Sequence, residues 1–277
     1  MSRGLGILNL YCILLKTNLL LICIMYLQKI SFLQGKLSNI LQFIQAEILF
    51  DWILPQKSQP LTVTQKSTLV FSPHQDDETL GCGGLIALKR ELGVPVKVVF
   101  ITDGHKSYLD IKPEDIVQVR KQEAQEALNI LGVASSDIYF IDQPDGELRQ
   151  ISDEQQLHTI NQLVHILQSF QPEEIYVPHQ KDKHPDHEAT YDLVKDALNK
   201  SGIKAQLFQY TVWLFWGMPL LLFRLNLEKL GQSYVVSIKS VLEKKQRAFQ
   251  VYRSQHHIFA RSFIGRFFKP TEIFFKS

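Results

Sequence analysis

The sequence predicts an α/β fold in which a mostly parallel sheet lies between layers of helices. Short apolar runs rich in β-branched and aromatic residues alternate with segments of helical period from residue 68 to residue 202. One of these runs, VKVVFIT at residues 96–102, is continuously apolar, as is typical of a strand buried on both faces. Strands that alternate with helices in this order favour parallel pairing, with helices on both sides of the sheet.

Each element has local signals of its own. The helix over residues 113–131 begins with Pro113, carries Glu114 and Asp115 in its first turn, and stops at Gly132. We expect strands over residues 68–71, 96–102, 138–141 and 174–177, and helices over residues 80–92, 113–131, 153–170 and 185–199. Together these elements predict a Rossmann-like three-layer sandwich.

The N-terminal segment is apolar from residue 7 to residue 27, which is long enough to cross a bilayer. Lys16 lies near its middle, and a central charge costs roughly 2.5–3.5 kcal/mol on insertion scales. A signal peptide is disfavoured, because no small-residue cleavage site follows the run. Three interpretations remain open: a weak membrane anchor, an amphipathic interfacial helix, or an extension upstream of a true start at Met25.

The division into domains follows from what comes next. Residues 28–53 have helical period, and residues 55–60 (PQKSQP) have the composition of a linker. We therefore expect a hydrophobic, helical extension over residues 1–60 and a catalytic domain over residues 61–277. A chain of 277 residues with 45% apolar and 21% charged residues can bury one sizeable core.

Charge and cysteine content limit the partners and the compartment. The formal net charge of +2 gives no support to nucleic-acid binding. Three cysteines make no disulfide framework and fit a reducing compartment, so we expect a cytoplasmic protein, with membrane association through the N-terminal segment left open. Residues 239–277 hold nine basic residues against Glu243 and Glu272, interleaved with phenylalanines. We favour a last helix with a solvated basic face, plus a strand or arm docked by its phenylalanines, over a surface for anionic lipid or phosphate.

Polar residues follow four of the predicted strands. They occupy residues 74–78, 103–105, 144–146 and 184–187. Ligands of open α/β sheets bind at the carboxyl ends of the strands. This convergence predicts an active site at that edge of the sheet.

The residue types at this edge favour a metal-dependent hydrolase. Zinc hydrolases need about three protein ligands and one open position for water, whose pKa the metal lowers. His74, Asp77 and His187 would supply such a set. Adjacent carboxylates do not easily chelate from one turn, so we expect Asp76 to act as the general base toward water that attacks a carbonyl carbon.

Two further residues of the second segment are candidates. We expect His184, three residues before His187, to be protonated near neutral pH and to donate to the developing oxyanion or the leaving nitrogen. Asp186 has two interpretations, as an outer partner that orients the His184 ring or as an acid that opens the next helix.

Two residues near the loop at 103–105 are candidates for substrate contact, one in the loop and one on the helix that follows it. Asp103 either binds substrate hydroxyls or caps a turn with Gly104, and Arg120 is either a clamp for an anionic group or a solvated helix residue. The glycines of residues 81–84 (GCGG) predict close packing of a helix on a strand, with Cys82 a small buried residue.

Four segments of the chain resemble the PIG-L/LmbE-like zinc-dependent de-N-acetylases: SPHQDDETLGCGG, VFITDG, RKQEAQEALNILGV and HPDHEAT. The resemblance covers residues 67–255, with residues 210–213 and 252–255 as weaker landmarks. It implies zinc ligands at His74, Asp77 and His187, a general base at Asp76, and an imidazole at His184 that stabilises the tetrahedral intermediate. It also implies sugar or aglycone contacts from Asp103, Arg120 and Asp145.

This sequence departs from the family pattern at two places. Gln75 stands where the family usually has proline, and Asp182 and Lys183 stand where a family tyrosine would be expected. The resemblance implies a zinc-dependent hydrolase that removes the acetyl group from an N-acetylglucosamine-type sugar conjugate or a glycolipid. The alternatives are a metal-dependent hydrolase of another small amide or ester, and a non-catalytic sugar-binding or membrane-associated accessory protein.

Overall fold

In the computed structural model, the residues described are 44, 48–106, 112–215, 230–256 and 261–276. The chain forms two compact units, Met1–Ile44 and Gln45–Ser277, and the fold described below is that of the second unit. The expected membrane anchor lies outside the described residues. Among the helices within the described ranges, none combines the length and apolar character needed to cross a bilayer.

The second unit contains an eight-stranded sheet with the order β1-β7-β8-β6-β5-β2-β3-β4. The strands are β1 (Gln59–Pro60), β2 (Thr68–Ser72), β3 (Val96–Thr102), β4 (Ile138–Gln143), β5 (Glu174–Pro178), β6 (Gln206–Tyr210), β7 (Gln232–Ser237) and β8 (Thr271–Lys276). Strand β8 is antiparallel to both of its neighbours, β6 and β7, and the other pairs are parallel. The sheet is therefore mixed and mostly parallel, which confirms the α/β prediction.

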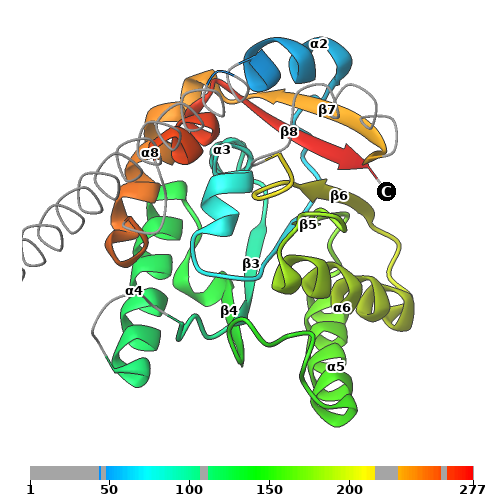
Figure 1. The fold of residues 1–277 in the computed structure, drawn as a ribbon. Helices are drawn as coiled ribbons and strands as arrows, with labels where there is room; N and C mark the ends of the chain where they lie inside the picture. Colours follow the sequence, from blue (N-terminus) through cyan, green and yellow to red (C-terminus); the bar gives the residue numbers. More distant parts are fainter. Residues whose placement is uncertain (1–43, 45–47, 107–111, 216–229, 257–260, 277) are drawn as a thin grey trace, which may run out of the picture. The chain divides into compact units, whose positions relative to one another are not determined.

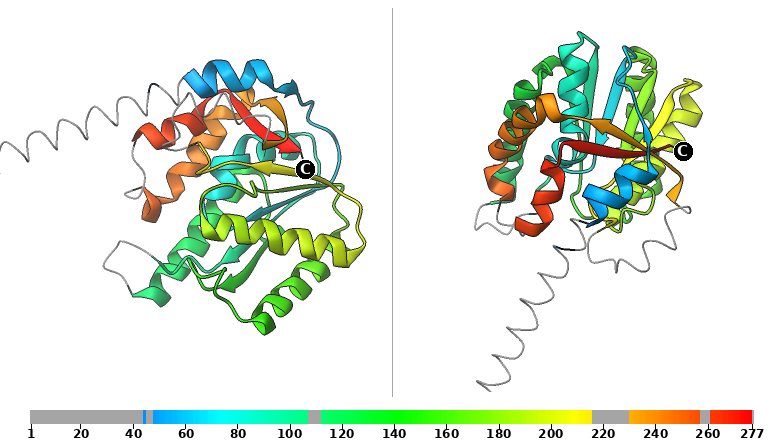
Figure 2. Two further views of the ribbon diagram at one scale, coloured as in Figure 1. Left: turned by 45° about the vertical axis from the view of Figure 1, so that its right-hand side comes forward. Right: turned by 90° about the horizontal axis from the view of Figure 1, so that it is seen from above.

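Helices cover both faces of the sheet (Figures 1 and 2). The longer ones are α3 (Asp77–Glu91), α4 (Pro113–Leu131), α5 (Asp153–Phe170), α6 (Pro185–Ser201) and α8 (Leu242–Val251). Val70 of β2 packs in one core with α3, α4 and α8, whereas its neighbours Leu69 and Phe71 pack in a second core with α5 and α6. Alternate residues of a strand point to opposite faces, so the central strands are buried on both sides.

The described part of the unit also contains short elements. They are the π-helix η1 (Leu49–Ile53), the helices α2 (Leu54–Lys57) and α9 (Arg261–Gly265), and the 3₁₀ helices η2 (Ser135–Asp137), η4 (Lys239–Val241), η5 (Arg253–Gln255) and η6 (Arg266–Phe268). Leu49 and Leu54 pack in a third core with Phe215 and Phe275.

Several predicted elements match the structure at both ends, among them β3, α4 and α5. The segment expected to be a linker differs. Residues 55–60 complete α2 and form β1, which pairs with β7 through Gln59 and Pro60. The segment gains this structure from a tertiary partner more than 170 residues away, and its own composition carries no sign of that pairing.

The glycines at the start of α3 allow close packing, as expected from residues 81–84. A Cβ atom on Gly84 would lie 2.5 Å from Ile238 Cγ2, and one on Gly81 would overlap the ring of Tyr210. Cys82 is buried, and burial is the main cause that raises the pKa of its thiol. Both observations fit a packing role for this stretch.

The C-terminal region is bonded into α3. The carboxylate of Glu272 accepts the backbone N–H groups of Gly84 (2.7 Å) and Leu85 (2.8 Å). Lys245 Nζ donates to Glu272 (2.7 Å) and to the carbonyl of Leu80 (2.8 Å). These buried bonds tie α8 and β8 to α3, the helix that carries Asp77.

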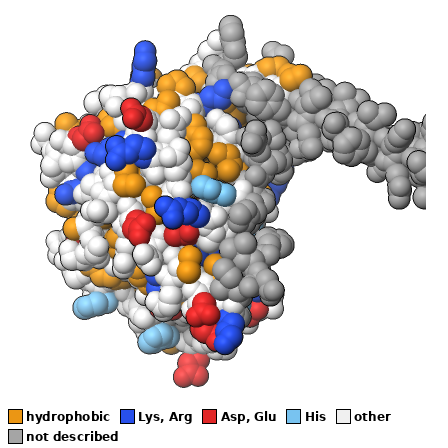
Figure 3. All heavy atoms as spheres, turned by 90° about the vertical axis from the view of Figure 1, so that its left-hand side faces the viewer, with side chains coloured by type: hydrophobic (Ala, Val, Ile, Leu, Met, Phe, Trp, Pro, Cys, Tyr) orange, Lys and Arg blue, Asp and Glu red, His pale blue; other side chains and the backbone are white. Residues whose placement is uncertain are grey.

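The surface shown in Figure 3 carries basic and acidic side chains that are interspersed with one another. The described residues on that face form no large patch of a single charge sign. This distribution agrees with the small formal net charge of the chain.

Candidate metal centre and active site

The loops after β2 and β5 meet at the carboxyl edge of the sheet and bring together His74, Asp77 and His187. Each of the three offers an atom that can ligate a metal, and these atoms lie within 4.8 Å of one another. The ring centroids of His74 and His187 are 5.4 Å apart. Two imidazoles and a carboxylate thus surround one point, although 110 residues separate Asp77 from His187 in sequence.

The distances indicate which atoms face that point. Asp77 Oδ2 lies 3.0 Å from His74 Nδ1 and 3.1 Å from His187 Nε2. The outer nitrogens of both rings meet other carboxylates. His74 Nε2 lies 3.1 Å from Asp145 Oδ1 and 3.1 Å from Asp186 Oδ2. His187 Nδ1 lies 2.8 Å from Asp182 Oδ2. Histidines that ligate metals nearly always donate their second N–H in this way.

Asp182 was missed as a site residue by the sequence reasoning. Its side chain is fully buried, and its carboxylate accepts the backbone N–H groups of Val212, Trp213 and Leu214 at 3.0–3.1 Å. These bonds fix the carboxylate that holds His187. The sequence offered one signal, an acid five residues before a candidate ligand, but nothing marked residues 212–214 as its partner.

The three central residues fit a divalent ion. His187 Nε2 is buried and forms no hydrogen bond with any residue that the structure describes. If Nδ1–H donates to Asp182, Nε2 carries a lone pair that faces the Asp77 carboxylate, and a cation between the two would satisfy both. Imidazole nitrogen and carboxylate oxygen are ligands of catalytic zinc sites.

Without an ion, protons on the two rings balance the acids. Burial lowers the pKa of His187, but the Asp77 and Asp182 carboxylates outweigh it and raise that pKa to about 9. The pKa of His74 is raised by Asp145, Asp186 and Asp77 against the effect of burial. Burial raises the pKa of Asp77, but the two histidines outweigh burial and lower that pKa overall. The cluster therefore attracts positive charge, as a metal site must.

Asp76 is buried beside this cluster and has an unusual backbone. Its φ angle is 147°, a value that residues other than glycine rarely adopt. Its backbone N–H donates to Glu78 Oε2 at 3.1 Å. Burial, and after it the charges of Asp77 and Glu78, raise the pKa of the Asp76 carboxyl. A carboxylate with a raised pKa next to a metal site has the properties of a general base.

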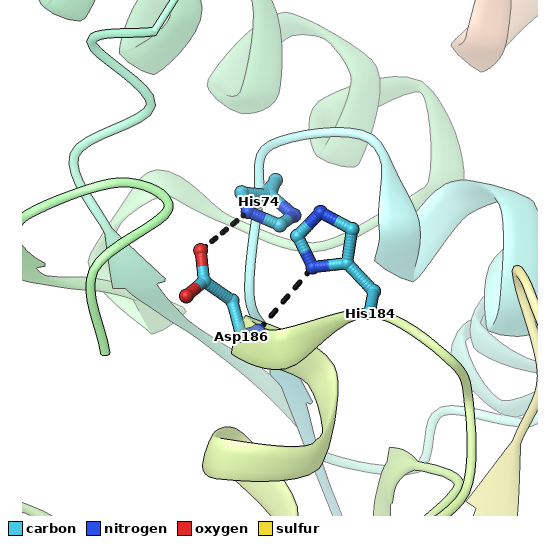
Figure 4. Close-up of side chains that lie close together, drawn as sticks. All are labelled: His74, His184 and Asp186. Atoms are coloured by element: carbon cyan, nitrogen blue, oxygen red, sulfur yellow. Dashed lines mark hydrogen bonds and ion pairs between the residues drawn. The ribbon is translucent and has the colours of Figure 1, made fainter. Parts of the chain in front are cut away.

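His184 caps the N-terminus of α6 and faces His74 (Figure 4). Its Nδ1 accepts the backbone N–H of Asp186 at 3.3 Å, so the proton of a neutral ring is on Nε2. Burial first, and then the charges of His187 and His74, lower its pKa to about 4. The ring is neutral near pH 7, in contrast to the expected imidazolium, and it still offers one N–H donor.

The carboxylate of Asp186 points away from the expected partner. It accepts the backbone N–H groups of Gly146 (2.6 Å) and Leu148 (3.1 Å) and lies against His74. The hydrogen bond between Asp186 and His184 is made by the backbone N–H of Asp186 and not by its carboxylate (Figure 4). Asp186 is therefore better described as an outer partner of a histidine than as an acid that opens the helix. The ring that its carboxylate contacts is that of His74 and not that of His184.

The three residues expected to contact substrate lie at different depths. Arg120 is 3% exposed, with Nη2 donating to the carbonyl of Lys106 at 3.0 Å and Nη1 3.7 Å from Asp145 Oδ2. Burial acts to raise the pKa of Asp145, but His74 and Arg120 outweigh it and lower that pKa to about 2. Asp103 is only partly buried, and its Oδ1 accepts the backbone N–H of His105 at 3.1 Å.

The comparisons with known proteins agree with this geometry. The family described as "PIG-L: GlcNAc-PI de-N-acetylase" matches residues 69–198, which include the whole central cluster. Residues 69–198 form a PIG-L family domain. This match confirms the family that the sequence motifs indicated. Residues 212–214, which hold Asp182, come after the matched segment.

The relatives of this chain carry more than one activity in their names. The probable N-acetyl-alpha-D-glucosaminyl L-malate deacetylase 2 of Bacillus subtilis is 28% identical over 197 residues, 69% of this chain and 84% of the relative. The 4-oxalmesaconate hydratase of Pseudomonas putida is 28% identical over 145 residues, 50% of this chain and 53% of the relative. The named deacetylases are amide hydrolases, and they confirm the prediction of an enzyme in the class that hydrolyses C–N bonds.

A solved structure supports the fold. The N,N'-diacetylchitobiose deacetylase of Pyrococcus horikoshii has a TM-score of 0.55 and 24% sequence identity, with 78% of this chain and 79% of that chain covered. The likeness shows that this chain shares its overall fold with that protein.

Proposed function

We propose that this chain is a zinc-dependent de-N-acetylase that hydrolyses the acetamide of an N-acetylglucosamine-type sugar conjugate and releases acetate and a free amine. The observation that carries the proposal is the set of His74, Asp77 and His187 around one point, with the buried carboxylate of Asp76 beside it. The family match and the Bacillus subtilis relative supply the substrate class.

Three residues would hold the metal ion, and three carboxylates hold the histidine rings in place. His74 Nδ1, Asp77 Oδ2 and His187 Nε2 would hold the divalent ion, whose Lewis acidity lowers the pKa of water and stabilises negative charge on a carbonyl oxygen. Asp145, Asp186 and Asp182 hold the outer nitrogens of the two rings. A site held in this way keeps its ligands oriented before the substrate binds.

In this mechanism Asp76 transfers protons, and His184 stabilises the oxyanion. Asp76 takes a proton from the attacking water as the new C–O bond forms at the acetyl carbon. His184 donates a hydrogen bond from its neutral Nε2–H to the oxygen that gains charge. The proton on Asp76 then passes to the sugar nitrogen as the C–N bond breaks, which regenerates the carboxylate.

The loop after β3 borders the substrate. We assign the partly exposed Asp103 to a sugar hydroxyl, because Arg120 and Asp145 are buried and already bonded to protein groups. Arg120 and Asp145 then support the substrate loop and His74, so their effect on the sugar is indirect. We place the reaction in the cytoplasm, which fits the free, buried thiol of Cys82.

The proposal is tested by acetate and amine release from a panel of N-acetylated amino sugars, both soluble conjugates and lipid-linked forms, with zinc-loaded protein. Asp76→Asn is expected to abolish turnover and keep the metal, whereas Asp192→Asn, a change on the exposed face of α6, leaves both intact. If Asp76→Asn loses zinc and Asp77→Asn does not, the roles of the two acids are exchanged. Wild-type protein that binds no zinc and cleaves no member of the panel refutes the proposal in favour of an accessory role.

A second candidate rests on the hydratase relative. The same base and oxyanion donor would add water to a C=C bond that is conjugated with a carboxylate. Incubation of the zinc-loaded protein with unsaturated dicarboxylates, followed by loss of their ultraviolet absorbance, separates this reaction from amide hydrolysis. Simple amides and esters in the same panel test a broader hydrolase activity.

A further inference from the structure

The short segment Tyr252–Gln255 follows α8 and lies beyond the residues that match the family. Arg253 is exposed, but the other three residues are buried, with Tyr252 fully enclosed and Ser254 and Gln255 at 5% and 3% exposure. None of the roles assigned above uses this segment. A segment of this polarity is buried only where its hydrogen-bonding groups find partners.

Those partners are two glutamates on the helices next to the site. Tyr252 Oη donates to Glu78 Oε1 at 2.6 Å. The backbone N–H and the hydroxyl of Ser254 donate to the two carboxylate oxygens of Glu123 at 3.0 and 2.6 Å. One C-terminal segment therefore holds an acid of α3 and an acid of α4.

The carboxylate of Glu78 also connects Tyr252 to Asp76, the candidate base. The second oxygen of Glu78 accepts the backbone N–H of Asp76, the residue with φ 147°. A backbone in such a region persists only when its surroundings hold it there. Tyr252 fixes one oxygen of Glu78, and the other oxygen fixes the strained peptide of Asp76.

We propose that Tyr252 is a positioning residue for the reaction, acting through Glu78 to orient Asp76. This inference rests on the proposed function, in which Asp76 takes the proton from water. Tyr252 touches neither Asp77 nor the two histidines in any bond of the described structure. Its loss should therefore disturb the base and leave the metal ligands in place.

The chain offers a matched control for the change Tyr252→Phe. Tyr176, on β5, is also buried, and its hydroxyl donates to a buried glutamate, Glu174, at 3.4 Å. Tyr176→Phe removes the same atom from a similar environment away from Asp76. Any loss that comes from a missing buried hydroxyl as such should appear in both variants.

We expect Tyr252→Phe to lower kcat on the best substrate of the panel about 10- to 100-fold, the range for small misplacements of catalytic groups. KM should stay within about twofold, and zinc content should match that of Tyr176→Phe, which keeps its kcat. Glu78→Gln should lower kcat similarly, and the double variant should lose little more, because both changes act on one link. Equal kcat values in the two phenylalanine variants, or additive losses in the double variant, refute the inference.

A second measurement does not depend on the enzymatic activity. Hydrogen exchange of the peptide covering residues 73–79, followed by mass spectrometry in zinc-loaded protein, reports the protection of the Asp76 N–H region. We expect faster exchange in Tyr252→Phe and unchanged exchange in Tyr176→Phe. If the wild type cleaves no amino sugar, the proposed function fails, while the exchange result still decides the link between Tyr252 and Asp76. Should Tyr252→Phe fail to fold, Glu78→Gln is measured in its place, and unchanged exchange there refutes the link.

Discussion

Asp182 holds His187 from outside the predicted metal site, and its removal is the sharpest test of how the site is built. Its carboxylate lies 2.8 Å from His187 Nδ1 and accepts three backbone N–H groups from residues 212–214. Asp182→Asn keeps the size of the side chain and replaces one acceptor oxygen by an NH₂ group. That group must face a ring N–H or backbone N–H groups, all of which are donors.

Two effects of known size should follow. Outer partners of metal-bound histidines typically contribute 10- to 100-fold to metal affinity, which corresponds to about 1.4–2.8 kcal/mol. A buried donor left without an acceptor costs about 1–3 kcal/mol of stability, and each kcal/mol lowers Tm by roughly 2–4 °C in a domain of this size. We therefore expect both weaker zinc binding and a lower melting temperature.

The assay is a zinc titration of chelator-treated protein in competition with a chromophoric chelator, with thermal melting of the same samples. Asp192→Asn is the matched control, since Asp192 lies on α6 like His187 but is exposed and pairs with Arg149 at 2.7 Å. It should change zinc affinity by less than twofold.

A clear result would refute the reasoning. If Asp182→Asn melts at a lower temperature but binds zinc as tightly as the wild type, Asp182 supports residues 212–214 and does not orient a ligand. The metal would then be held elsewhere or by other atoms of the cluster.

The remaining predictions concern stability. Because burial and neighbouring acids raise the folded-state pKa of Asp76, its ionised form destabilises the metal-free fold above that pKa. Metal-free Asp76→Asn should melt higher than wild type at pH 7. The gap should narrow as the pH falls from the folded-state pKa toward the ordinary pKa of an aspartate, below which the carboxyl is neutral in both the folded and the unfolded chain; a gap that widens in acid contradicts this. Gly84→Ala should cost about 1–3 kcal/mol, because its Cβ would press on Ile238, whereas full stability in urea unfolding would show that Ile238 has room to move.

The sequence predicted most of the layered fold because its signals are local. A continuous apolar run marked β3, and Pro113 and Gly132 marked the two ends of α4. It did not predict β1, β6 and β7 as strands of the sheet. These strands depend on partners distant in the chain, and β1 consists of two exposed residues that only their pairing with β7 defines.

The composition of the candidate site was also contained in the sequence. His74, Asp76, Asp77, His184 and His187 stand in two short motifs, and their residue types alone indicate metal and proton chemistry. Parallel strands bring such motifs to one edge of a sheet, so their meeting could be expected before any coordinates were known.

Only the tertiary structure decided how these side chains are held. The carboxylate of Asp186 faces His74, Asp182 holds His187, and Tyr252 reaches Glu78 across 174 residues. The physical reason is that the choice of a hydrogen-bonding partner depends on direction and distance in space, and spacing along the chain encodes neither for residues that meet through the packing of separate strands and helices.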